Sequence, residues 1–146
     1  MKEKLKAKPI LGFTDTETVK LDFDETNSGN VKHWALRTMK WFRLGGFILL
    51  KSSEKHYHAV FNREVSWSEN MRIVVWVAMQ SRNQGLFKWF HMQCIKESST
   101  LRISTKRQKP SPKIIFRYGK EDQQIKHFLK DRDLIKSIAR KLAGKP

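Results

Sequence analysis

The chain has 146 residues, 39% of them hydrophobic, which suits one compact domain with a real core. Thirty Lys and Arg stand against fourteen Asp and Glu, and the formal charge of +16 favours a polyanionic partner, with nucleic acid preferred over a membrane. No apolar run approaches the ~18 residues of a spanning helix, and the N-terminus lacks the apolar core of a signal peptide, so we expect a cytoplasmic protein with no membrane partner. The single Cys94 excludes an internal disulfide and a multi-cysteine zinc site.

Residues 1–12 are Lys-rich and contain Pro9, which predicts a basic flexible arm before a single domain over residues 13–146.

The first predicted strand carries two aspartates. The stretch VKLDFD (19–24) then alternates apolar and polar residues, as a half-buried strand does. Asp22 and Asp24 therefore share one face of that strand. Two like charges side by side favour a bound cation, and Mg²⁺ or Mn²⁺ accepts such oxygen ligands.

A helix and a hairpin should follow this strand. Residues 31–42 carry apolar side chains at helical spacing, and the helix should end at Gly45-Gly46. The segments FILL (47–50) and HYHAVF (56–61) predict two strands joined by a polar turn. His56 and His58 occupy alternate positions of the second strand, so both imidazoles face the same side.

The second half of the chain predicts another helix, two strands and a last helix. Ser66 and Glu69 have capping-box spacing ahead of an apolar helical face, whereas residues 84–95 fit either a short helix or a strand. TLRIS (100–104) and KIIFRYG (113–119) predict strands around the basic loop TKRQKPSP, and residues 125–142 predict a C-terminal helix with a basic outer face. The order β-α-β-β-α-β plus a helix predicts an α+β domain with an antiparallel sheet, like that of RNA-recognition modules.

The first two blocks resemble the archaeo-eukaryotic primase superfamily, which includes plasmid and viral primase-polymerases. The resemblance lies in VKLDFD, a helix, and then GGFILLKSSEKHYHAVF. It implies that Asp22 and Asp24 bind Mg²⁺ or Mn²⁺, and that Ser52 or Ser53 holds the phosphates of a nucleoside triphosphate together with His58. Asp22, Asp24 and His58 are then the catalytic residues.

The third block is IKESSTLRISTKRQKP, which is similar to a family segment where a carboxylate precedes basic residues. On this match Arg102 and Lys106 neutralise phosphate. The family has an aspartate near position 96, where this chain has Lys96 and then Glu97, so Glu97 becomes the third metal ligand if a bulge turns it inward. The resemblance spans about residues 18–109 and implies a nucleotidyltransferase of DNA replication on a single-stranded DNA or RNA template. A replicative helicase is a further partner to consider.

Two other functions stay open at the level of sequence. Histidine-hydrophobic-histidine on a strand resembles the metal motif of rolling-circle replication nickases, which use a tyrosine nucleophile. Because Tyr57 faces away from the two imidazoles, Tyr118 would be that nucleophile. The third function is a non-catalytic single-stranded nucleic-acid-binding module, in which exposed aromatics stack bases. However, most of the aromatic residues on or beside apolar helical faces are expected in the core: Trp34, Trp41, Trp76 and Phe128.

Overall fold

The computed structural model describes residues 9–144, so most of the predicted basic arm, residues 1–8, lies outside the described part. The predicted α+β class, with antiparallel sheets and a C-terminal helix, is confirmed. In chain order the elements are β1 (Gly12–Asp15), β2 (Thr18–Phe23), α1 (Ser28–Trp41), β3 (Gly46–Ser53), β4 (His56–Glu64), α2 (Trp67–Ser81), α3 (Gln84–Lys96), β5 (Ser99–Arg102), β6 (Lys113–Gly119) and α4 (Gln124–Leu142).

The main sheet has four antiparallel strands in the order β2-β4-β3-β6, and a second pair joins β1 to β5. The predicted hairpin is β3 with β4. Because β4 lies between β3 and β2, its histidines come beside the aspartates of β2, and Asp22 pairs directly with His58. The last strand, β6, takes the other edge of the sheet beside β3.

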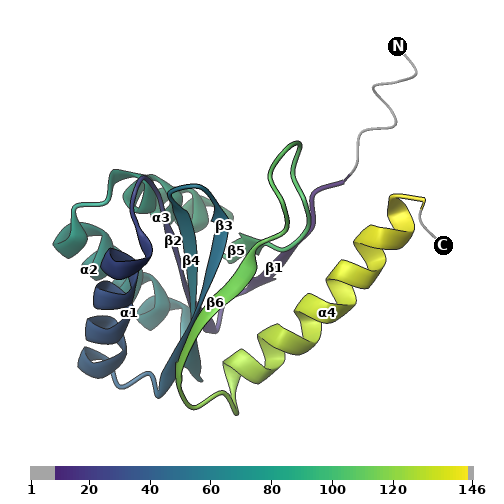
Figure 1. Ribbon diagram of the computed structural model, residues 1–146. Coiled ribbons are helices and arrows are strands. Elements are labelled where there is room, and N and C mark those ends of the chain that lie inside the picture. Colours follow the sequence, from purple (N-terminus) through teal and green to yellow (C-terminus); the bar gives the residue numbers. More distant parts are fainter. Residues whose placement is uncertain (1–8, 145–146) are drawn as a thin grey trace.

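Side-chain alternation gives the main sheet two different faces. One face, which includes Leu21 and Ala59, packs against α1, α2 and α3 in the larger core. The other face, which includes Leu50 and Val60, packs against α4 and the β1–β5 pair in a smaller core. Figure 1 shows the three helices on one side of the sheet and α4 on the other. The side chains of His58 and Asp22 belong to the α4 side, because neighbours along their strands point into the larger core.

Side-chain caps start the first three helices. Asn27 accepts from the Asn30 amide at α1, and Asn83 accepts from the Leu86 amide at α3. Ser66 accepts from the Glu69 amide, which confirms the predicted start of α2. With Asn83 as its cap, the segment Gln84–Lys96 is a helix, and the strand alternative for that segment is wrong.

Three residue-level expectations need correction. Glu97 does not lie on a strand, because it ends α3 in the left-handed region with φ 62°. Trp41 is 71% exposed rather than buried, and it stacks on Trp76 at a ring-centroid distance of 6.3 Å. The part of the arm that is described is held in place, since the Leu11 amide donates to Ser104 Oγ at 2.8 Å and Gly12 begins β1.

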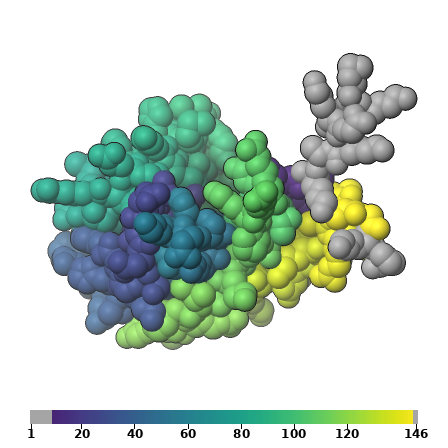
Figure 2. Space-filling model, turned by 45° about the horizontal axis from the view of Figure 1, so that its top comes forward, coloured from purple at the N-terminus to yellow at the C-terminus, as the bar shows by residue number. Residues whose placement is uncertain are grey.

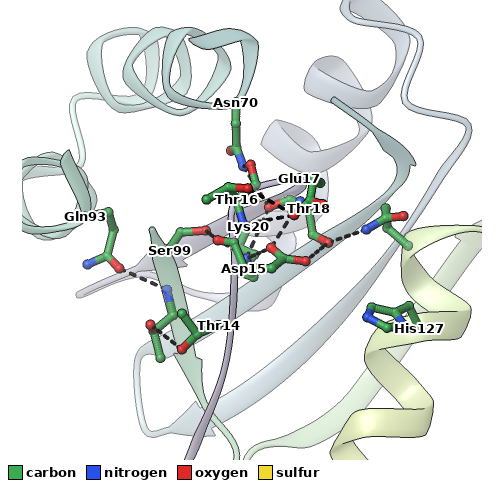
Figure 3. A network of polar contacts seen from close by, with 12 residues as sticks. Thr14, Asp15, Thr16, Glu17, Thr18, Lys20, Asn70, Gln93, Ser99 and His127 are labelled. Atoms are coloured by element: carbon green, nitrogen blue, oxygen red, sulfur yellow. Dashed lines mark hydrogen bonds and ion pairs between the residues drawn. The ribbon is translucent and has the colours of Figure 1, made fainter. Parts of the chain in front are cut away.

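A buried lysine joins the two sheets. Lys20 is fully buried, and its ammonium donates to Asp15 Oδ1 at 2.5 Å, to Ser99 Oγ at 2.8 Å and to the Thr18 carbonyl at 3.3 Å (Figure 3). Burial lowers the pKa of Lys20, and the charge of Asp15 opposes that shift. The partners come from β1, β2 and β5, so this network fixes β5 against the main sheet. Since β5 ends at Arg102, the network also sets where Arg102 meets the sheet.

Candidate nucleotide and metal site

Polar residues from several strands and one loop meet in a cleft of about 230 Å³ on the α4 side of the sheet. The lining includes Asp22 and all the residues that the family resemblance assigns to nucleotide binding. The full lining is Ile10, Asp22, Ser52, Ser53, His56, His58, Arg102, Lys106 and Lys109. Ile10, His56 and Lys109 are the residues of this cleft that the resemblance did not assign.

Two carboxylate-imidazole pairs form where β2 runs beside β4. Asp22 Oδ1 lies 3.6 Å from His58 Nε2, which is too long for a hydrogen bond. Two residues further along each strand, Asp24 Oδ1 contacts His56 Nδ1. Both pairs follow from the antiparallel register, in which Asp22 is opposite His58 and the next residues stay aligned.

The donor set beside the cleft fits a divalent cation. Asp24, Glu25 and His56 each offer one ligand atom, and these atoms all lie within 4.8 Å of one another. Carboxylate oxygens with one imidazole nitrogen suit Mn²⁺, whereas Mg²⁺ prefers oxygen ligands. Glu97 is exposed at the end of α3 and belongs neither to this group nor to the cleft lining. The structure thus brings Glu25 and His56 to Asp24, and it does not bring Glu97.

Glu25 was missed by sequence reasoning because it follows the strand. It has a positive φ of 49°, so the chain turns there and the alternation of β2 no longer predicts its direction. The signal for His56 was visible as its spacing from His58, but only the pairing of β2 with β4 shows which carboxylate it meets.

Burial sets the protonation of the central pair. Burial in the cleft, together with the charge of Asp24, raises the pKa of Asp22 to about 7, against the opposing charge of Arg102. Burial also lowers the pKa of His58 to about 3, helped by the charges of Arg102 and His56. His58 is therefore a neutral imidazole at pH 7, which can donate or accept a hydrogen bond but carries no charge toward a phosphate.

Arg102 holds the basic loop in place. Its guanidinium donates from Nη1 to the carbonyls of Ser104 at 2.5 Å and Pro110 at 2.8 Å, and from Nη2 to the Ser52 carbonyl at 3.1 Å. At the tip, Lys106 and Lys109 exchange backbone hydrogen bonds of 3.0 and 2.8 Å. The loop is therefore a closed hairpin that presents its lysines beside the cleft.

The two serines of β3 differ in what they can still bind. Ser52 Oγ donates to the His56 carbonyl at 3.2 Å. Ser53 Oγ is buried and has no hydrogen-bond partner within residues 9–144. Because a buried hydroxyl without a partner is costly, Ser53 is the better candidate of the two for binding a ligand.

Tyr118 lies far from the histidines. It pairs with Phe47 near the opposite end of β3 from the cleft, and its ring stacks on Phe47 with centroids 5.6 Å apart. Phe47 belongs to the larger core, so Tyr118 is on the other face of the sheet from His58. This geometry gives no support to a nickase that uses Tyr118.

Comparisons with models of protein families, with curated proteins and with solved structures found no match. Within residues 9–144, no helix combines the length and apolar character needed to cross a membrane.

Proposed function

We propose that the protein is a metal-dependent nucleotidyltransferase of the primase-polymerase type, which acts in the cytoplasm on a single-stranded template. One observation carries this proposal: Asp22, Ser53, His58, Arg102 and Lys106, from separate segments of the chain, line one cleft. The resemblance of the three sequence blocks to the archaeo-eukaryotic primase superfamily supports it.

The residues of the cleft suit the chemistry of nucleotide joining. In that reaction a 3′-hydroxyl oxygen bonds to the α-phosphorus, pyrophosphate leaves, and the hydroxyl proton passes to solvent. A divalent ion held beside Asp22 by Asp24, Glu25 and His56 would neutralise charge on the phosphates. Lys106 and Arg102 add fixed positive charge, while neutral His58 and the Ser53 hydroxyl can donate hydrogen bonds to phosphate oxygens.

The test is nucleotide incorporation on a single-stranded DNA template with Mn²⁺ and labelled nucleoside triphosphates. We expect dinucleotides or longer products. Asp22→Ala should abolish them, and His58→Ala should slow their formation by about 10²-fold, the usual cost of one lost hydrogen-bond donor. Tyr118→Phe, on the other face of the sheet, is the control and should leave the rate unchanged.

Two outcomes would reject the proposal. If no product forms while the protein still binds the template, the protein is a binding module. If label from the DNA stays on the denatured protein and is absent in Tyr118→Phe, the protein is a nickase, since a tyrosine nucleophile forms a covalent link with the cut strand.

A further inference from the structure

The basic hairpin separates the candidate site from a second hollow. A cavity of about 290 Å³ lies on the side of the hairpin that faces α4. Its lining combines three hydroxyl groups of the hairpin (Ser104, Thr105 and Ser111) with two cations of the helix (Lys136 and Arg140). Three apolar residues complete it: Pro9, Ala139 and Ala143. Figure 2 shows the hairpin in green between the blue-teal turn of β3 and β4 and the yellow end of α4.

The hairpin is strongly cationic and is fixed from both sides. The segment from 102 to 113 contains five Lys or Arg residues and no acid: Arg102, Lys106, Arg107, Lys109 and Lys113. Arg102 bonds its base from the cleft side, and on the other side Arg132 Nη2 of α4 donates to the Pro112 carbonyl at 3.3 Å. These contacts anchor the base of the hairpin, and Figure 1 shows its tip projecting away from the sheet.

The face of α4 beside the cavity carries a row of cations. Arg132, Lys136 and Arg140 are four residues apart, which places them on one side of the helix at steps of about 6 Å. Lys136 is half-buried, and neither Lys136 nor Arg140 forms an ion pair or a side-chain hydrogen bond within residues 9–144. Unpaired cations beside the hydroxyls of Thr105 and Ser111 are the donors that backbone phosphates require.

We propose that this second cavity binds backbone phosphates of a single-stranded nucleic acid, and that the strand crosses the hairpin from the cleft to α4. Cations line both sides of the hairpin and its tip, which suits a chain of phosphates better than one free phosphate. A membrane surface is not favoured. The exposed apolar residues Leu134, Ile138 and Leu142 stand two positions on from the cations, about 200° around the helix, so they face away from the cavity. The course of the strand toward the cleft rests on the proposed function, whereas the phosphate site does not.

The first test measures how binding depends on salt, using a labelled oligothymidine and fluorescence anisotropy. Each phosphate contact contributes about −0.7 to the slope of log affinity against log salt for a single strand. Lys136→Ala with Arg140→Ala should therefore weaken binding and reduce the steepness of the slope by about 1.4. Arg72→Ala with Lys88→Ala removes the same charge from exposed positions of α2 and α3, and it should leave the slope unchanged.

The second test locates the strand on the intact protein. Bound oligothymidine should protect Lys136 and Lys106 from acetylation, measured by mass spectrometry, and should leave Lys88 reactive. Equal losses of affinity in the two double variants, or no protection of Lys136, would overturn the proposal. The proposal would also be overturned if Lys136→Ala with Arg140→Ala lost binding to phosphatidylserine vesicles but kept its affinity for oligothymidine, because the surface would then serve a membrane.

These outcomes separate the new surface from the proposed function. Both double variants should keep the thermal shift that Mn²⁺ with a nucleoside triphosphate produces, because neither touches the cleft. If the Lys136 and Arg140 variant loses the strand while wild-type protein joins no nucleotides, the surface stands and the enzymatic proposal fails.

Discussion

At the scale of single residues, the candidate site contains two neighbouring groups with opposite pKa shifts: the pKa of Asp22 is raised and that of His58 is lowered, so the order of the two values is reversed. Asp22 keeps its proton to about pH 7, and His58 stays neutral down to about pH 3. Both shifts have burial as their main cause. The pair therefore holds less charge at neutral pH than its residue types suggest, and an added cation would favour the charged carboxylate. Titratable groups with strongly shifted pKa values in a cleft are typical of functional sites.

Asp22→Asn should make the metal-free protein more stable, increasingly so as the pH rises from about 4 to 7. In that window the folded state holds a proton on Asp22 that the unfolded state releases, so wild-type stability falls with rising pH. Asparagine removes this penalty. We expect the melting temperature to rise by a few degrees at pH 8 and by less at pH 5, since about 1 kcal/mol corresponds to about 2–4 °C in a domain of this size.

Differential scanning calorimetry without metal checks this expectation. Asp133→Asn, at an exposed position of α4, is the control for the loss of one carboxylate. A melting temperature that falls in Asp22→Asn at pH 8 would mean that the charged carboxylate stabilises the fold through Arg102.

The imidazole beside Asp24 makes a separate prediction about the metal. His56→Ala should weaken Mn²⁺ binding by about tenfold or more and Mg²⁺ binding less, because a nitrogen ligand matters more to Mn²⁺. Glu25→Gln should weaken both ions. Electron paramagnetic resonance of free Mn²⁺ during titration gives the affinities, with His91→Ala on α3 as the control. Unchanged Mn²⁺ affinity in His56→Ala would remove His56 from the donor set.

At the scale of elements, local signals predicted some segments and long-range pairing produced the others. The alternation of apolar residues predicted the strand β2, and Ser66 predicted the start of α2; both elements are confirmed, although β2 is buried on both faces from Thr18 to Leu21. The four-residue β1 has no such pattern; it exists because it pairs with β5, with Thr14 and Thr100 in contact across 86 positions. The burial of Lys20 could not be predicted for the same reason, since its partners Asp15 and Ser99 meet only after that pairing.

The same distinction explains the candidate site. Asp22 and His58 were found because their spacing along strands is a local pattern, and one antiparallel register brought them together. Glu97 was expected on a strand, where only a bulge would turn it inward, yet the Asn83 cap and the helix that follows carry it to the end of α3. Lys136 and Arg140 had no visible relation to the hairpin, because their approach depends on how α4 packs across the sheet.

Lys20→Met should destabilise the protein by about 3–5 kcal/mol, the usual cost of removing one partner from a buried ion pair. The substitution keeps a long apolar side chain but leaves Asp15 without its ammonium partner. Urea unfolding gives the free energy of unfolding. Adding Asp15→Asn to Lys20→Met should recover part of the loss, since the uncompensated carboxylate is then removed.

The matched control is Lys51→Met, which breaks the exposed pair with Glu54 and should cost less than about 1 kcal/mol. If Lys20→Met is as stable as Lys51→Met, the network in Figure 3 does not join the two sheets energetically.

At the scale of the whole molecule, the excess charge is the dominant feature. A formal charge of +16 on 146 residues repels itself in the compact state. The cleft, the hairpin and the cationic row of α4 gather part of this charge on the side of the sheet away from α1, α2 and α3. A bound polyanion would relieve the repulsion there, so stability and nucleic-acid binding should be coupled.

The coupling predicts opposite effects of salt on the free and bound protein. Without ligand, the melting temperature should rise as sodium chloride increases from 10 to 150 mM, because the Debye length falls from about 30 to about 8 Å and the repulsion is screened. With saturating oligothymidine at low salt, the melting temperature should start higher and its gain should shrink as salt increases, because binding to the folded state weakens. Chloride is the suitable salt, since sulfate strengthens apolar burial by itself. The two curves should approach each other at high salt. Parallel curves would mean that the ligand does not act through charge, and a flat curve for the free protein would mean that the fold already compensates its +16.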